Sequence, residues 1–302
     1  MECAPAALFV YNRPEHTRRT VEALLRNPEA SNTDLIVFSD APRAPKAAEK
    51  VREVRDYVRT IQGFKSLTVE ERTRNAGVRA SIIEGVTQLC RKRGRVIVLE
   101  DDLLTSPHFL EFMNAGLERY DRERRVMQVS GHSFPISIGL PEDAILLPFT
   151  TSWGWATWDR AWRHFDAQGS GYERLAGDKS LKRRFDLYGG YRFFDLLTSQ
   201  RQGKVDSWAI LWYLSVFLQE GLGLFPRKTL VRNIGLDGSG VNRFRRSVPG
   251  QEENPDFRVG RLPERAEPSP LSETVLRGFF PGGHSALVSL VRRLLLALSP
   301  RR

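Results

Sequence analysis

The chain of 302 residues carries a formal net charge of +10, and 41% of its residues are hydrophobic. This length and composition are ordinary for a globular protein and allow one large domain or two smaller ones. No apolar run reaches the roughly 18 residues of a membrane-spanning helix, and no signal peptide is expected. Cys3 and Cys90 form neither a disulfide framework nor a metal-binding pattern, so a reducing cytoplasm is expected. The positive charge favours nucleotides, anionic lipids or nucleic acid as partners, or reflects a generally basic proteome.

Strand-like and helix-like segments alternate along the first half of the chain. Short apolar runs predict strands over 6–10, 35–38, 65–71 and 96–99. Helices are predicted over 17–26, 45–61 and 78–90. This alternation is typical of an α/β fold with a mostly parallel central sheet flanked by helices.

The most informative segment is the apolar run 96–99, which Glu100, Asp101 and Asp102 follow directly. A buried parallel strand has such a composition, and open α/β sheets bind their ligands at the carboxyl ends of the strands. Adjacent carboxylates repel one another, and a divalent metal relieves this repulsion. Mg²⁺ and Mn²⁺ bind through one or two carboxylates plus substrate phosphates. The segment therefore indicates a metal-nucleotide site or, alternatively, a solvated acidic turn before the next helix.

The second half of the chain has a different composition, with four of its six tryptophans between residues 151 and 162. Trp155, Trp158 and Trp162 have helical spacing, so we expect much of this segment to lie in the core. The other expected segments are a helix over 109–120, a strand over 126–131, a glycine-rich loop over 233–240, a poorly ordered linker over 243–283 and a basic amphipathic helix over 284–302.

Five segments of the chain are similar to those of a known family. They read VYNRP, FSD, RNAG, VLEDDLLTSPHFLEFM and SWGWATW. Together they resemble metal-dependent glycosyltransferases of the A-type nucleotide-sugar fold, especially bacterial sugar transferases distantly similar to N-acetylglucosaminyltransferase I. The resemblance covers residues 5–242 and implies a Rossmann-like fold. It implies a glycosyltransferase domain over 1–242, with a nucleotide-binding half over 1–106 and an acceptor and catalytic half over 107–242.

By this resemblance Asp102 is the direct ligand of a divalent metal, Mn²⁺ or Mg²⁺, which neutralises the leaving diphosphate. The resemblance also implies contacts with the nucleotide sugar from Arg13, Asp40, Arg74, Asn75, Arg79, Glu100 and Asp101. Asp40 has an alternative role as the cap of the segment that follows it. One departure lies after the glycine-rich loop, where similar sequences often read Gly-Thr-His and this chain has Asn242, a weaker ligand. A turn role is expected for Asp237.

An inverting transfer needs a base that takes the proton of the acceptor hydroxyl. Asp206 has apolar and aromatic neighbours in the sequence, which would raise its pKa, and it falls where similar enzymes keep their catalytic aspartate. Alternatively, Asp206 is the N-cap of the helix that begins near Trp208. Trp153 and Trp155 are expected to line the acceptor or donor sugar, with buried packing as the alternative.

The resemblance implies a hexosyl- or N-acetylhexosaminyltransferase that uses a nucleoside diphosphate sugar, expected to be UDP-linked. The expected acceptor is a glycan or lipid-linked saccharide, with no nucleic-acid partner. The enzyme is expected in the cytoplasm, where residues 284–302 either contact the anionic inner face of the membrane or dock on the domain.

Two other classes of protein remain open. A sugar nucleotidyltransferase shares the nucleotide-binding architecture but needs a glycine-rich phosphate loop, and the segment VYNRPEHTRRT lacks glycine. A non-catalytic protein that binds glycans, nucleotides or nucleic acid would suit the positive charge and the tryptophans. Three adjacent acids, however, repel phosphate when no metal is present.

Overall fold

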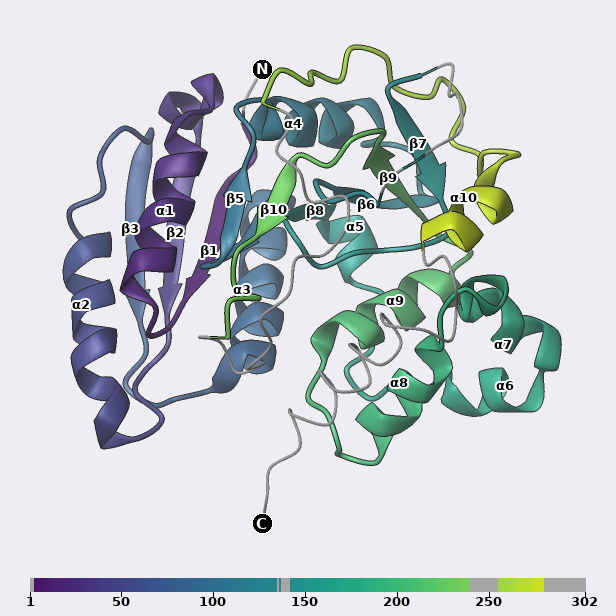
Figure 1. Cartoon of the computed structure of the whole chain (residues 1–302), viewed down its shortest axis with the longest axis horizontal. Helices are drawn as coiled ribbons and strands as arrows, with labels where there is room; N and C mark the ends of the chain where they lie inside the picture. Colours follow the sequence, from purple (N-terminus) through teal and green to yellow (C-terminus); the bar gives the residue numbers. More distant parts are fainter. Residues whose placement is uncertain (1–2, 135, 137–141, 239–254, 280–302) are drawn as a thin grey trace.

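The computed structural model describes residues 3–134, 136, 142–238 and 255–279 (Figure 1). An eight-stranded mixed sheet with the strand order β3-β2-β1-β4-β8-β6-β9-β7 forms its centre, and β10 pairs with β5 in a small second sheet. The strands are β1 (Ala6–Val10), β2 (Asp34–Ser39), β3 (Ser66–Glu71), β4 (Arg95–Glu100), β5 (Leu103–Thr105), β6 (Val126–Ser130), β7 (Ala144–Leu147), β8 (Trp155–Trp158), β9 (Leu222–Pro226) and β10 (Val231–Asn233).

Helices flank the central sheet (Figure 1). The α-helices are α1 (Pro14–Leu25), α2 (Ala48–Val58), α3 (Gly77–Arg93), α4 (Phe109–Arg119), α5 (Asp159–Trp162), α6 (Tyr172–Gly177), α7 (Lys179–Phe185), α8 (Phe193–Arg201), α9 (Trp208–Leu218) and α10 (Ser272–Phe279). The 3-10 helices are η1 (Pro28–Asn32), η2 (Pro45–Ala47) and η3 (Leu187–Gly189). Four of the seven strand pairings in the large sheet are parallel, so the expected α/β fold with a mostly parallel sheet is confirmed.

Local sequence explains where two of these helices begin or end. Helix α1 begins at Pro14, three residues earlier than expected, because proline has a suitable φ and no N–H to satisfy in the first helical turn. Helix α3 ends at Arg93, and Gly94 follows with a φ of 77°, a left-handed conformation that glycine adopts without a steric cost. The helix ends therefore follow from proline and glycine at the positions that favour them.

The connections among the first four strands reverse direction at β1. The chain runs from β1 outward to β2 and β3 and then crosses to β4 on the other side of β1. Phe9 pairs with both Phe38 and Glu100, and all of these pairings are parallel. The segments that follow β1, β2 and β4 therefore leave the sheet at the same edge. A reversal of strand order of this kind is where open α/β sheets bind ligands.

The second half of the chain adds antiparallel strands and a separate group of helices. β8 pairs antiparallel with both β4 and β6, and β7 pairs antiparallel with β9. Helices α6 to α9 gather at the lower right of the molecule, away from β1 to β3 (Figure 1). They bury a second hydrophobic cluster, which includes Phe185, Tyr213 and Phe217 and extends to Phe149 and Phe225. This aromatic cluster and the edge of the sheet where β1, β2 and β4 end thus belong to different parts of the fold.

The tryptophan-rich segment is buried as expected, but its helical spacing is misleading. Trp155 and Trp158 lie at the two ends of strand β8, and only residues 159–162 form a helix, α5. Trp155, Trp158 and Trp162 are all buried. Pairing on both sides, with β4 and β6, satisfies the backbone of residues 155–158 and outweighs the local helical pattern.

The expected linker over 243–283 is corrected for the part that the structure describes. Phe257, Val259 and Leu262 pack against the main hydrophobic cluster, and the carbonyl of Pro263 accepts a hydrogen bond of 2.6 Å from Tyr120. Residues 272–279 form helix α10. Partly buried apolar side chains compensate for the polar composition of this segment. Residues 243–254 and 280–283, and the predicted helix over 284–302, lie outside the described residues.

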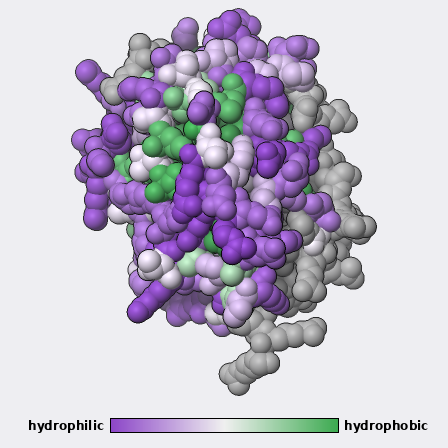
Figure 2. Space-filling model, turned by 90° about the vertical axis from the view of Figure 1, so that its left-hand side faces the viewer, coloured by the Kyte–Doolittle hydropathy of each residue, from purple (hydrophilic) through white to green (hydrophobic). Residues whose placement is uncertain are grey.

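Figure 2 shows the face formed by the strands and helices at the left of Figure 1. Most of this face is hydrophilic, with one group of hydrophobic residues in its upper part. Among the residues described, none of the helices has the length and apolar character needed to cross a membrane. The predicted peripheral contact of residues 284–302 with a membrane stays a prediction.

Candidate functional site

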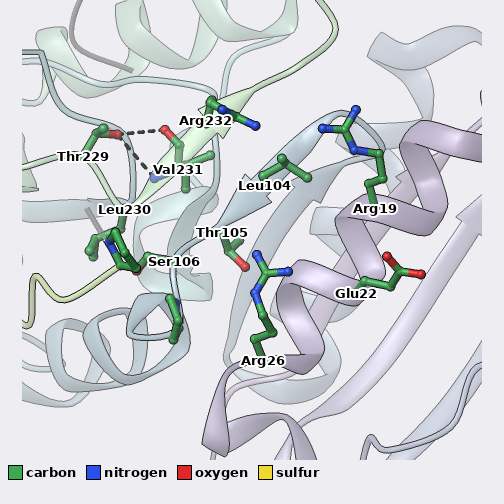
Figure 3. Close-up of a pocket in the computed structure, with 12 residues that line it drawn as sticks. Arg19, Glu22, Arg26, Leu104, Thr105, Ser106, Thr229, Leu230, Val231 and Arg232 are labelled. Carbon is green, nitrogen blue, oxygen red and sulfur yellow. Dashed lines mark hydrogen bonds between the residues drawn. The ribbon is translucent and has the colours of Figure 1, made fainter. Parts of the chain in front are cut away.

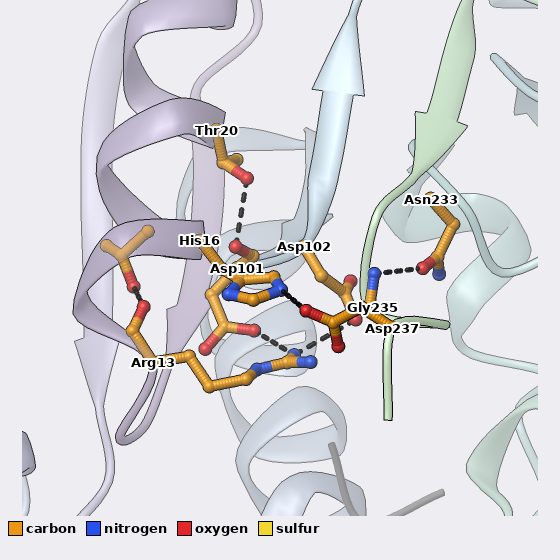
Figure 4. Close-up of polar contacts among 9 residues, drawn as sticks. Arg13, His16, Thr20, Asp101, Asp102, Asn233, Gly235 and Asp237 are labelled. Atoms are coloured by element: carbon orange, nitrogen blue, oxygen red, sulfur yellow. Dashed lines mark hydrogen bonds and ion pairs between the residues drawn. The ribbon is translucent and has the colours of Figure 1, made fainter. Parts of the chain in front are cut away.

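An acid cluster, Glu100, Asp101 and Asp102, lies at the carboxyl end of β4. Glu100 ends the strand, and the two aspartates form the turn into β5. The guanidinium of Arg13, between β1 and α1, pairs with Asp101 and lies 3.0 Å from a carboxylate oxygen of Asp102 (Figure 4). The side chains of Asp101 and Asp102 are only 5% and 15% exposed. The structure therefore brings together four residues that the sequence analysis assigned to one site.

Burial and mutual repulsion dominate the electrostatics of the acid cluster. Burial, and then the charges of Asp102 and Asp101, raise the pKa of Glu100 to about 8. Burial also raises the pKa of Asp101, although the charge of Arg13 opposes this shift. For Arg13, burial acts to lower the pKa, but the combined effect of the two aspartates raises it. Three carboxyl groups thus share one guanidinium, and a further cation at this place would favour their ionised forms.

A loop after β10 closes the acid cluster from the side opposite α1 (Figure 4). The backbone N–H of Ile234 donates to the carbonyl of Asp102 over 2.8 Å. Gly235 then passes so close that a Cβ atom there would lie 2.0 Å from Oδ2 of Asp102. Asp237 pairs with His16 on α1 at 3.1 Å, which joins the loop to the helix. The expected turn role of Asp237 is therefore accompanied by a contact that the sequence analysis did not predict.

Three residues around the acid cluster were missed by the sequence analysis. They are His16, Thr20, whose hydroxyl donates to the carbonyl of Asp101 over 2.9 Å, and Gly235. The first two follow Arg13 by three and seven residues, the spacing of one helix face. This spacing was the available signal for His16 and Thr20. Gly235 lies in the expected glycine-rich loop, but no local signal showed its role, because its need for a small residue arises from contact with Asp102, which is distant in the chain.

Asp40 holds the turn that starts α3. Its two carboxylate oxygens accept from the N–H groups of Ala41, Ala76 and Gly77 at 2.8, 3.0 and 2.8 Å, and from the side-chain amide of Asn75 at 2.9 Å. A carboxylate has about four acceptor positions, and these four bonds use them. The alternative role of Asp40 as a cap is thus observed, although it serves α3 and the turn before it as well as the next residue. Its contact with a nucleotide stays a prediction.

Arg79 and Asp206 meet near the first turns of α3 and α9. Their side chains lie 3.4 Å apart, and Arg79 also donates to the carbonyl of Ala167 over 3.0 Å. The Asp206 side chain is 64% exposed, so the expected apolar surroundings of this carboxylate are wrong. Asp206 is not the N-cap of α9 either, because the Ser207 hydroxyl accepts from the N–H of Ile210 over 3.4 Å. Arg74 is exposed.

The two tryptophans predicted to contact a sugar have different environments. Trp155 is fully buried and stacks on Trp208, with ring centroids 5.2 Å apart, so the prediction of a sugar contact by Trp155 is corrected in favour of packing. Trp153 is only partly buried, beside His132 at 4.6 Å. Because Val98 pairs antiparallel with Trp155, Trp153 lies toward the end of β4 that carries the acids.

The acid cluster fits a metal ion that is shared with a substrate. In the parts of the chain that the structure describes, no three His, Cys, Asp or Glu side chains are arranged to hold a metal. Hard divalent cations are nevertheless bound through one or two carboxylates when substrate phosphates complete the coordination. Asp102, with an oxygen ligand and a partly exposed side chain, suits this mode. Asn242 lies outside the described residues.

No protein-family model matches the chain, and no curated protein matches its sequence. The solved structures similar to it include TarS of S. aureus, at 12% identity over 78% of this chain and a TM-score of 0.40. They also include the mannosyltransferase PcManGT of Pyrobaculum calidifontis, solved with GDP-Man and Mn²⁺, at 12% identity over 70% of this chain and a TM-score of 0.36. The chain spans 37% of the TarS chain and 69% of the PcManGT chain. The function of this chain must therefore be argued from its own residues.

Proposed function

We propose that this protein is a metal-dependent glycosyltransferase. It would move a sugar from a nucleoside diphosphate sugar, UDP-linked, to a glycan or lipid-linked saccharide, with inversion at the sugar carbon. The observation on which this proposal rests is the acid cluster at the carboxyl ends of the adjacent strands β1 and β4, where Arg13 contacts two of its three carboxyl groups. An α/β sheet binds nucleotides where its strand order reverses in this way.

In this proposal Asp102 holds the metal together with the diphosphate of the donor. When bound, the metal would neutralise the charge that develops on the leaving diphosphate. Arg13 orients Asp101 and Asp102, and its positive charge reduces the repulsion between them. Ribose and base contacts are assigned to Glu100, Asp101 and the turn that Asp40 holds in place.

Arg79 and Asp206 form the proposed acceptor side of the reaction. The exposed carboxylate of Asp206 is accessible to an acceptor hydroxyl and would take its proton as the sugar is transferred. Arg79, at 3.4 Å, would orient this carboxylate. Trp153 offers an aromatic face for a sugar ring at the same edge of the sheet. Arg74 and Asn75 are assigned to the nucleotide.

The segment between β1 and α1 argues against a sugar nucleotidyltransferase. Only Tyr11, Asn12 and Arg13 separate the strand from the helix, and the helix begins with Pro14. A phosphate loop uses glycines and successive backbone N–H groups at a helix N-terminus. Proline removes one of these donors, and the neighbouring Arg13 is already engaged with the acid cluster.

Calorimetric titration with UDP, with and without Mn²⁺, tests the proposal. The wild-type protein should bind UDP in a Mn²⁺-dependent manner, and Asp102→Asn should weaken binding by about tenfold or more, because it removes the charged ligand. The matched control is Asp56→Asn, an exposed aspartate on α2 that pairs with Arg59. It should bind UDP as the wild type does.

Asp206→Asn separates binding from transfer. This variant should retain Mn²⁺-dependent UDP binding and lose transfer from a UDP-sugar. If the affinities for UDP and GDP change neither with Mn²⁺ nor in the Asp102→Asn variant, the proposed metal-nucleotide site is contradicted. Release of pyrophosphate from a nucleoside triphosphate and a sugar phosphate would instead identify a nucleotidyltransferase.

A further inference from the structure

A cavity lies beside α1, at the far end of β5 from the acid cluster. Its volume is about 410 Å³, and its walls come from α1, β5 and β10 and the segments next to them (Figure 3). This size is within the range of small-molecule sites. Strand β5 begins directly after Asp102, so the cavity and the acid cluster share one strand and one helix.

Three arginines give this cavity its charge. Arg19 extends from α1, Arg26 from the position directly after this helix and Arg232 from β10, and their guanidinium groups point into the same space above β5 (Figure 3). Glu22 also lines the cavity, but its carboxylate points away from the three guanidinium groups. We call Arg19, Arg26 and Arg232 with the cavity between them the arginine pocket. Like charges held together in this way create a positive potential that attracts an anion.

The guanidinium groups of Arg19 and Arg26 are not used within the described part of the chain. Neither guanidinium forms an ion pair or hydrogen bond with a residue that the structure describes. Their neighbour Arg18 differs, because it lies 3.9 Å from Glu15 and over the ring of Tyr57. Guanidinium groups bind phosphate oxygens through paired N–H donors. Arg19 and Arg26 are therefore available for a phosphate group.

The remaining walls suit a saccharide attached to that phosphate. The Ser106 hydroxyl oxygen accepts from the N–H of His108 over 3.2 Å, which leaves its O–H group as a donor. Leu104, Pro107 and Pro255 add apolar surface, which complements the C–H groups of a sugar ring. A free inorganic anion would use only the arginines, whereas a sugar phosphate would use the whole cavity.

We propose that the arginine pocket binds a phosphate group on a saccharide of the acceptor, so that the acceptor is a phosphorylated glycan. This inference rests on the proposed function, which it extends to the substrate class. The three residues of β5 and Asp102 span about 13 Å at the usual rise of a strand. An acceptor a few units long can therefore place one phosphate in the arginine pocket and a hydroxyl group near the donor.

Calorimetric titration of the full chain with glucose 6-phosphate, glucose and inorganic phosphate tests this inference. The wild-type protein should bind glucose 6-phosphate more tightly than either fragment, and added NaCl should weaken this binding. The double variant Arg19→Gln and Arg26→Gln should weaken it by about tenfold or more. Arg52→Gln, an exposed arginine on α2, is the matched control and should change nothing. Thermal melting of each variant verifies that it is folded.

The two proposals fail in different ways. The double variant should retain Mn²⁺-dependent UDP binding, and Asp102→Asn should retain glucose 6-phosphate binding. If glucose 6-phosphate binding is lost in Asp102→Asn and unchanged in the double variant, the phosphate lies in the acid cluster region and the inference is overturned. Equal binding of inorganic phosphate and glucose 6-phosphate overturns the saccharide part, and no binding of any phosphate at 10 mM or below, about the weakest useful affinity, overturns all of it.

Discussion

The acid cluster and the arginine pocket lie at opposite ends of the same helix and strand, and they differ in whether their charges are paired within the protein. Arg13 satisfies Asp101 and Asp102 inside the protein, and a loop packs over them. In the arginine pocket, Arg19 and Arg26 have no partner among the described residues. Charges that are paired and buried contribute to the fold as well as to a site, whereas charges left open are accessible to a ligand. We therefore expect a large loss of stability when Arg13 is replaced and little change when Arg19 and Arg26 are replaced.

Removing the cation of the acid cluster should have the largest effect. Arg13→Met leaves three carboxyl groups close together and mostly buried, and we expect a loss of about 3–5 kcal/mol in the free energy of unfolding. Arg18→Met, on helix α1, loses an exposed contact with Glu15 and one with the ring of Tyr57 and should cost less than about 1 kcal/mol. Chemical denaturation of both variants measures the difference. Equal stability of the two would contradict the assignment of Arg13 to a compensated cluster.

The pH dependence of the free energy of unfolding tests the environment of His132, which lies behind the arginine pocket. His132 is buried, 3.2 Å from the hydroxyl of Thr229, a residue that lines the pocket. Burial lowers its pKa from 6.5 to about 3. The unfolded chain therefore binds the proton first, so the stability is complete above pH 6.5 and is lost as the pH falls. Between pH 6.5 and 4.5 the loss should be about 2 kcal/mol.

His132→Gln is the control for this pH effect. Glutamine does not titrate, so the variant should show a smaller loss of stability than the wild type between pH 6.5 and 4.5, as measured by urea denaturation at each pH. Acidic groups elsewhere affect both proteins equally. Identical slopes in the two proteins would show that His132 is not kept neutral by its buried position.

The close approach of the 234–237 loop provides a steric test of the acid cluster. Gly235→Ala places a Cβ atom against Asp102, and overpacking of this kind costs about 1–3 kcal/mol. The displaced loop should also weaken Mn²⁺-dependent UDP binding. Gly177→Ala is the matched control, because a Cβ atom there meets nothing within 4 Å. Chemical denaturation and UDP titration measure both effects. Gly235→Ala should lose stability and bind UDP more weakly, whereas Gly177→Ala should do neither.

Replacement of Asp40 by asparagine should lower the stability, whereas the same replacement at a helix cap that uses only one carboxylate oxygen should not. Asp40→Asn replaces one of two acceptor oxygens with a donor, so backbone N–H groups at the start of α3 lose a partner, at a cost of about 1–2 kcal/mol. Asp178→Asn, at the N-cap of α7, should be nearly neutral because a single oxygen there accepts both bonds. Thermal denaturation compares the two, and equal losses would contradict this account.

The smallest effect on stability is expected in the arginine pocket. The double variant Arg19→Gln and Arg26→Gln removes no contact with the described residues, so its unfolding free energy should stay within about 0.5 kcal/mol of the wild type. A large loss in urea denaturation would show that these arginines serve the fold. The contrast with Arg13→Met would then disappear.

Much of the edge that carries the acid cluster could be predicted from the sequence. Apolar runs marked β1, β2 and β4, and the abrupt change to Glu100, Asp101 and Asp102 marked the carboxyl end of a buried strand. These features are local, because strand burial and the end of a strand are recorded in neighbouring residues. Arg13 could be placed at the same edge because parallel strands align their carboxyl ends.

Contacts between distant segments were decided by the tertiary structure alone. Residues 155–158 have a helical pattern but form a strand, since β4 and β6 pair with both of their edges. The exposure of Asp206, the need for glycine at 235 and the convergence of the arginines from α1 and β10 arise from packing between elements far apart in the chain. Local sequence patterns were enough to predict that β1, β2 and β4 are buried and that acids follow β4. Only the three-dimensional arrangement decided which charges are compensated, because compensation depends on distances that no local pattern records.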